Sequence, residues 1–196
     1  MKLLSLHPGW LAALASIVAA GCDRGSSNSA VAPSAAETRQ VTETGQVAAK
    51  ALMASLGGQL KAALQSGGPV EALQVCQQAA QPITSAAGAQ FEGVTIHRTT
   101  LKPRNPANAP DEIDRAVLEK MTKESSPLST VEWQDGVARY YQPVMIQEIC
   151  LKCHGAPASF PAELTAKLAD LYPVDQATGY AVGDFRGVIR VDVTRP

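Results

Sequence analysis

Two stretches in the first half of the chain carry apolar residues every three or four positions, the spacing of one helix face. The first stretch predicts a long helix over residues 38–65, with a kink at Gly57-Gly58. Ser66-Gly67-Gly68-Pro69 is expected to end it, because glycine terminates helices and proline favours a first helical turn. A second helix is predicted over residues 70–86. Its apolar face holds Leu73, Cys76, Ala80 and Ile83.

Alternation of apolar and polar residues predicts strands farther along the chain. One strand is expected over residues 91–99 and a last one over residues 188–193. Residues 131–133 and 137–146 predict a hairpin, because the Asp135-Gly136 pair between them is typical of a tight turn.

Two shorter helices complete the predicted elements. One follows the proline-rich loop 101–111, and Asn108 or Asp111 is expected to cap it. The other lies within residues 159–171, where leucines recur at helical spacing.

The composition is that of one globular domain. The chain has 196 residues, of which 45% are hydrophobic, enough for a substantial core. The formal net charge of −1 provides no broad basic surface, so we expect no nucleic-acid partner.

The N-terminus predicts export. Lys2 precedes a short apolar run over residues 11–20, which is typical of a signal peptide over residues 1–21. The run ends in Val18-Ala19-Ala20-Gly21-Cys22, which resembles a bacterial lipobox, although Ala19 stands where leucine is preferred. We expect a lipidated Cys22 and a flexible tether over residues 22–37, which would anchor a periplasmic domain, residues 38–196, to a membrane. The alternative is ordinary cleavage near Gly21.

The sequence Cys150-Leu151-Lys152-Cys153-His154-Gly155 contains C-x-x-C-H, the attachment signature of c-type haem. Two thiols at this spacing can each form a thioether with a haem vinyl group, and His154 can ligate the iron. The alternatives are a redox dithiol and half of a zinc site. Export favours haem, since covalent attachment in bacteria takes place outside the cytoplasm.

Three residues are candidates for the iron ligand opposite His154. Cys76 lies on the apolar face of the second helix, where it is either a thiolate ligand or a small buried side chain. His97 lies on an alternating strand, where surface or edge positions are commoner. Met145 could supply a thioether, but core packing is the simpler interpretation.

Other side chains are candidates for contacts with the haem propionates. Arg98, Lys102 and Arg104 form a cationic stretch that is either solvated or paired with carboxylates. The hydroxyl of Tyr140 or Tyr141 could also lie near a propionate.

In their order along the chain, five motifs together resemble the periplasmic c-type haem proteins with a PAS-like fold, a family long catalogued as a domain of unknown function. They span almost the whole chain after the tether. They are Val75-Cys76, Arg98-Thr99, residues 104–111, the C-x-x-C-H stretch and the tail that includes Gly183-Asp184-Phe185-Arg186-Gly187.

The resemblance implies a single α+β domain, in which helices, including long N-terminal ones, flank a PAS-like antiparallel sheet. It also implies one covalent haem with Cys76 as the second axial ligand. His97 departs from the family pattern, where a small residue is expected before the arginine, and this leaves His/His ligation open.

The function that this sequence favours is electron transfer or redox sensing by an exported monohaem cytochrome, without enzymatic activity. Its redox or signalling partner is unknown. An alternative is a module that senses NO or CO through a displaceable Cys76. Two further hypotheses are a peroxidase that uses His97 and a structural zinc site built from Cys76, Cys150, Cys153 and a histidine.

Overall fold

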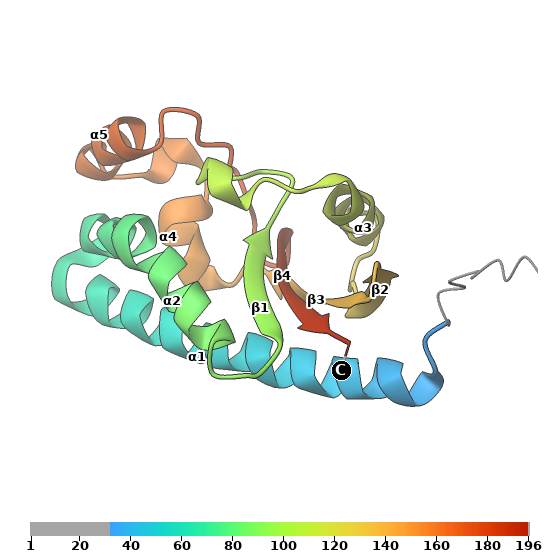
Figure 1. Cartoon of the computed structure of the whole chain (residues 1–196). Coiled ribbons are helices and arrows are strands. Elements are labelled where there is room, and N and C mark those ends of the chain that lie inside the picture. Colours follow the sequence, from blue (N-terminus) through green and yellow to red (C-terminus); the bar gives the residue numbers. More distant parts are fainter. Residues whose placement is uncertain (1–31, 196) are drawn as a thin grey trace, which may run out of the picture. The chain divides into compact units, whose positions relative to one another are not determined.

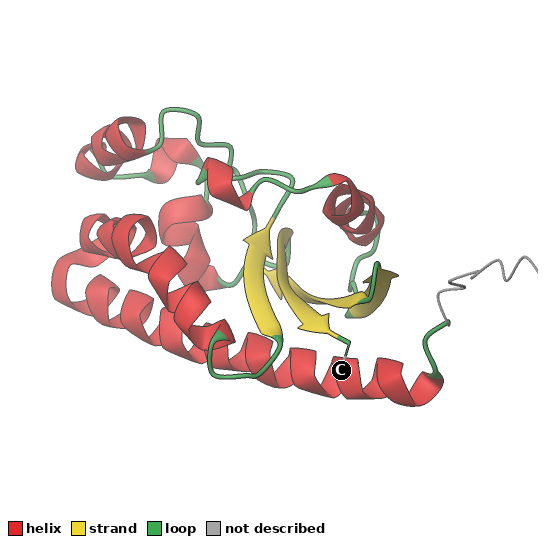
Figure 2. Cartoon of the chain, in the orientation of Figure 1, coloured by secondary structure: helices red, strands yellow, loops and turns green. Residues whose placement is uncertain are grey.

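The computed structural model describes residues 32–195, which form an α+β domain (Figure 1). The predicted signal peptide, Cys22 and most of the predicted tether lie outside the described residues. The predicted fold class is confirmed, since helices flank a four-stranded antiparallel sheet and a long helix precedes it (Figure 2).

The strands lie in the spatial order β1-β4-β3-β2, so the last strand of the chain is central in the sheet. Their bounds are β1 Val94–Thr99, β2 Thr130–Gln134, β3 Val137–Met145 and β4 Phe185–Thr194. β2 and β3 form the predicted hairpin. Asp135 and Gly136 in its turn have φ values of 49° and 80°, as a type I′ turn requires.

The α-helices are α1 Ala35–Gln74, α2 Ala80–Gly88, α3 Glu112–Thr122, α4 Leu151–His154 and α5 Ala162–Leu171. A π-helical segment, Val75–Ala79, joins α1 to α2. Three 3₁₀ turns are Pro106–Asn108, Glu148–Cys150 and Pro157–Ser159. None of the helices in the described part of the chain is long and apolar enough to cross a membrane.

A capping box begins α1 and a glycine interrupts it. Ser34 Oγ accepts a hydrogen bond from the Glu37 N–H at 3.2 Å, and the Glu37 carboxylate accepts one from the Ser34 N–H at 2.7 Å. At Gly68, φ is 69° and ψ is −160°, so the helical path breaks there and resumes at Pro69, as the sequence predicts. Gly57-Gly58, where a kink was expected, stays within the helix.

The first face of the sheet packs against α1, which runs along it in Figure 1. Ala48 and Leu52 of α1 belong to one buried cluster with Tyr140 of β3 and Val191 of β4. At Gly45 the helix lies so near the sheet that an added methyl group would overlap the Tyr140 ring.

The second face packs against α3. Val117, Leu118 and Met121 of α3 form a buried cluster with Tyr141 of β3 and Val188 of β4. Tyr140 and Tyr141 thus point to opposite faces, as successive residues of a strand do.

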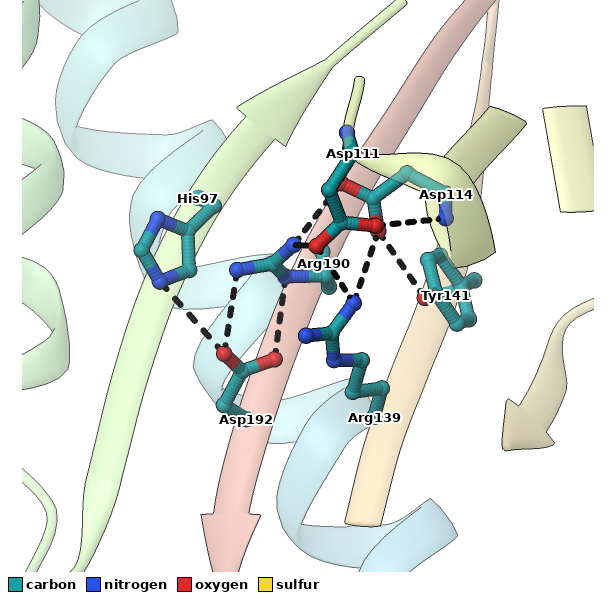
Figure 3. A network of polar contacts seen from close by, with 7 residues as sticks. All are labelled: His97, Asp111, Asp114, Arg139, Tyr141, Arg190 and Asp192. Carbon is teal, nitrogen blue, oxygen red and sulfur yellow. Dashed lines mark hydrogen bonds and ion pairs between the residues drawn. The ribbon is translucent and has the colours of Figure 1, made fainter. Parts of the chain in front are cut away.

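Beside this cluster lies a network of polar side chains (Figure 3). Asp114 is buried, and its carboxylate accepts from the Tyr141 hydroxyl at 2.9 Å and from Arg190 Nη1 at 2.7 Å. Asp111 caps α3 and accepts from Arg139 Nη1 at 2.7 Å. The network therefore joins the start of α3 to β3 and β4.

The glycines of α1 allow a matched stability test. We expect Gly45→Ala to lower the free energy of unfolding by about 1–3 kcal/mol, since the added methyl displaces the Tyr140 ring. Gly58→Ala should raise it by about 0.5–1 kcal/mol, because the new methyl meets no atom within 4 Å beyond the neighbouring residues and local backbone of its own helix, and alanine favours helix. Urea unfolding measures both. Equal effects of the two substitutions would contradict the close packing at Gly45.

Candidate haem site

A cavity of about 330 Å³ opens between α1, α4 and the sheet. Its walls are mostly apolar, with Leu52, Leu56 and Leu60 contributed by one side of α1. The three motif residues Cys150, Cys153 and His154 and the distant Cys76 also line it. Folding therefore brings together four candidate ligands and attachment points from two regions of the sequence.

The C-x-x-C-H stretch is held on a short helical segment. Cys150 ends a 3₁₀ turn, and α4 continues directly from it to His154. Gly155 then leaves the helix, and a side chain there would approach the Leu151 carbonyl oxygen to 2.7 Å. Glycine at this position thus lets the chain turn immediately after the histidine.

The His154 ring is oriented by one hydrogen bond. Its Nδ1 lies 2.6 Å from the Ala177 carbonyl oxygen, which can only accept, so Nδ1 carries the proton. Burial lowers the pKa of His154 to about 3, and the nearby positive charges of Arg104 and Arg186 act in the same direction. The imidazole is therefore neutral at physiological pH. This tautomer leaves the lone pair of Nε2 available to a metal.

Cys76 enters the cavity from the π-helical segment Val75–Ala79. Such segments are rare and often occur at functional sites. Burial raises the pKa of the Cys76 thiol, while the positive charges of three cavity arginines act in the opposite direction. Without a bound metal, Cys76 is thus a neutral thiol. The positive charges around it would accommodate a thiolate if a metal bound there.

Three arginines line the cavity, and two of them form no ion pair with a carboxylate of residues 32–195. Arg104 forms an ion pair with Asp175 at 3.0 Å. Among the described residues, Arg98 and Arg186 form no ion pair, and Arg98 Nε is buried without a hydrogen-bond partner. Burial lowers the pKa of both arginines, which means that their charge is partly desolvated. The cavity therefore has unmet capacity to bind anionic groups.

A bulge in β4 places Arg186 in the cavity. Val144 pairs with Gly187 and Met145 pairs with Phe185, so Arg186 is the extra residue. Gly187 has a φ of 145°, and a side chain there would meet the Thr99 carbonyl oxygen at 2.6 Å. Arg186 Nη1 then donates to Thr100 Oγ1 at 2.8 Å. Arg186 lies within the tail motif but is not among the site residues predicted from the sequence.

The structure separates His97 from the other candidates. Arg98 lines the cavity, whereas the preceding residue, His97, points to the opposite face of β1. There His97 Nε2 lies 3.5 Å from Asp192, and its side chain is 44% exposed (Figure 3). This placement contradicts the His/His alternative and removes the acid–base group that a peroxidase would need.

Some of the remaining predicted residues line the cavity and others do not. Met145 and Arg104 line the cavity. Tyr141 does not, since its buried hydroxyl is bonded to Asp114 on the other face, so the expected contact with a propionate is wrong. Lys102 is exposed and donates to the Thr178 carbonyl oxygen at 2.9 Å.

The structure also gives no support to the zinc hypothesis. Within residues 32–195, no three or more His, Cys, Asp or Glu side chains are grouped so that they could hold a metal ion. Cys76 and the C-x-x-C-H residues line one cavity without forming such a group.

These features define a class of protein, an α+β domain in which a C-x-x-C-H motif and a helix cysteine share a cavity beside an antiparallel sheet. The sequence model of the Tll0287-like family matches residues 25–194, and the chain belongs to this family. The match confirms the resemblance inferred from the motifs.

A solved structure has the same fold. It is described as the crystal structure of the cyanobacterial haem protein Tll0287, and it superimposes with a TM-score of 0.57 at 24% sequence identity. The similarity covers 84% of this chain and 98% of that chain. No curated protein matches the chain.

Proposed function

We propose that this protein binds one c-type haem in the cavity, through thioethers to Cys150 and Cys153. The observation that carries the proposal is the lining of the cavity. Apolar side chains, three thiols, a neutral imidazole and two arginines that form no ion pair with the described residues meet there. This set matches an apolar macrocycle that carries an iron and two carboxylates. The solved relative is itself described as a haem protein.

His154 and Cys76 are the residues proposed to hold the haem iron. The Ala177 carbonyl oxygen holds His154 in the tautomer that exposes Nε2, and the π-helical segment brings Cys76 to the same cavity. A bound haem would supply one-electron redox chemistry, with a low potential because a thiolate donates charge to ferric iron. Met145 also lines the cavity and is the alternative ligand.

Arg98 and Arg186 are the proposed partners of the propionates. Both line the cavity without an ion pair to any described residue, and the buried Arg98 Nε has no acceptor in that part of the chain. Arg104 is less suited to this role than the sequence suggests, because its guanidinium is already bonded to Asp175. A carboxylate at Arg98 or Arg186 would form charge-assisted hydrogen bonds in a partly desolvated site.

We propose electron transfer or redox sensing, without enzymatic activity, as the role of this haem. The partner would be a separate redox or signalling protein. A gas-sensing role is the second candidate, because burial favours Cys76 as a neutral thiol once it is released from a metal. Failure of the reduced, haem-loaded protein to bind CO would contradict that second role.

The proposed location is the periplasm, with a lipid on Cys22 anchoring the domain to a membrane. The support is the lipobox-like sequence that ends at Cys22 and the requirement of haem attachment for an exported chain. Metabolic labelling with a fatty acid tests the anchor. The wild-type chain should incorporate the label and Cys22→Ser should not; an unlabelled wild type would contradict it.

The ligands can be tested by spectroscopy on protein exported from cells that attach haem. The wild type should carry covalent haem with a thiolate-type ferric absorption spectrum that changes on reduction. Cys76→Ala should lose the thiolate features, since the substitution removes the sulfur. His97→Ala is the matched control and should leave the spectrum unchanged, because His97 lies on the other face of β1.

Three results would contradict this assignment. An unchanged spectrum in Cys76→Ala would exclude the thiolate, and a changed one in His97→Ala would restore the histidine. Colourless wild-type protein with stoichiometric zinc would exclude haem altogether.

The role of the arginines can be tested without covalent attachment. In the Cys150→Ala/Cys153→Ala chain, Arg98→Gln and Arg186→Gln should each weaken haem affinity by about tenfold or more, which corresponds to one charge-assisted hydrogen bond. Titration followed by absorbance measures the affinity. Arg115→Gln on the exposed side of α3 is the control and should have no effect. If Arg98→Gln and Arg186→Gln bind haem as tightly as the control Arg115→Gln, the proposed propionate contacts are wrong.

A further inference from the structure

The Ala177 carbonyl oxygen accepts two hydrogen bonds from side chains that line the cavity. One comes from His154 Nδ1 at 2.6 Å, and the other comes from Arg104 Nη2 at 3.3 Å. The same Arg104 nitrogen donates to the Cys153 carbonyl oxygen at 2.5 Å. Ala177 is fully buried and Arg104 is 7% exposed, so water does not compete for these bonds. One guanidinium thus binds both the residue before His154 and the acceptor of the His154 ring.

Asp175 completes this unit. One carboxylate oxygen lies 3.0 Å from Arg104 Nε, and the other accepts from the Ala177 N–H at 2.8 Å. The side chains of Arg104 and Asp175 are only 8% and 12% exposed, so salt screens their charges weakly. Asp175 therefore opposes the charge of Arg104 and also fixes the turn that presents the Ala177 carbonyl group.

We infer that the Arg104–Asp175 pair sets how strongly His154 donates to the iron, and so adjusts the reduction potential. This inference rests on the proposed function, because it requires haem in the cavity. A histidine ligand becomes a stronger donor when the acceptor at its other ring nitrogen binds the proton more tightly. A guanidinium on the same carbonyl oxygen draws electron density away from that acceptor, which makes His154 a weaker donor. Arg104 is thus a positioning and tuning residue rather than a ligand.

The two members of the pair act on the potential in opposite directions. Arg104 raises it, because its positive charge disfavours ferric iron and because it weakens the acceptor of the His154 proton. Asp175 lowers it, because its negative charge offsets that of Arg104. Removing Arg104 should therefore shift the potential downward, and neutralising Asp175 should shift it upward.

The experiment compares midpoint potentials of the full, exported, haem-loaded chain by spectroelectrochemistry. Arg104→Gln should shift the potential to more negative values and Asp175→Asn to more positive values. Arg104→Lys keeps the charge but not the planar fork, so its shift should be smaller than that of Arg104→Gln. Arg195→Gln is the control, because it removes the same charge from an ion pair with Glu37 elsewhere in the fold. That variant should leave the potential near the wild-type value.

The directions of the two shifts in midpoint potential distinguish tuning of His154 from simple loss of structure. If the pair only holds the loop in place, both substitutions loosen the same turn and shift the potential in the same direction, which would overturn the inference. No shift in the loaded variants would overturn it as well. Should Arg104→Gln fail to load haem, the downward shift of Arg104→Lys and the upward shift of Asp175→Asn decide the question. Absence of haem from the wild type would instead refute the proposed function.

Discussion

The alternation of side chains along the strands divides this domain into two chemically different halves. On one face of the sheet, α1 and the cavity meet Arg98 and Ile189. On the other face, α3 covers a network in which aspartates and arginines form ion pairs. Because neighbouring residues of a strand point to opposite faces, His97 and Arg98 belong to different halves although they are adjacent in the sequence. The candidate haem site depends on this division.

Charge balance differs sharply between the two halves. Around α3, Arg139 and Arg190 are matched by Asp111 and Asp114, which suits a structural role. In the cavity, Asp175 matches Arg104, but Arg98 and Arg186 are unmatched among the described residues. Burying a charge without a partner costs stability, so a fold that keeps two such arginines at one cavity is suited to an anionic ligand.

Much of the candidate site follows from the sequence, because its residues lie on regular periods. The C-x-x-C-H motif is local, and helical spacing places Cys76 on an inward-facing stripe. Arg186 could not be found in this way, since a bulge inserts one residue and breaks the alternation on which strand prediction rests. Tyr141 was misassigned because alternation shows that a strand has two faces but not which face borders the cavity. The Ala177 carbonyl oxygen is a backbone atom and has no sequence signature.

The position of β4 has a consequence for the order in which the chain can fold. β4 is the last strand in sequence, yet it pairs with both β1 and β3 at the centre of the sheet. Pairing β1 with β4 closes a loop of about half of the described domain, a slow event in folding because of its entropy. Until residues 185–194 arrive, β1 and the β2–β3 hairpin have unpaired edges, which favour aggregation. The C-x-x-C-H motif precedes β4 in the sequence, so it is synthesised before the strand that completes its cavity. Cys150 and Cys153 are therefore present in the chain before β4 can close the fold.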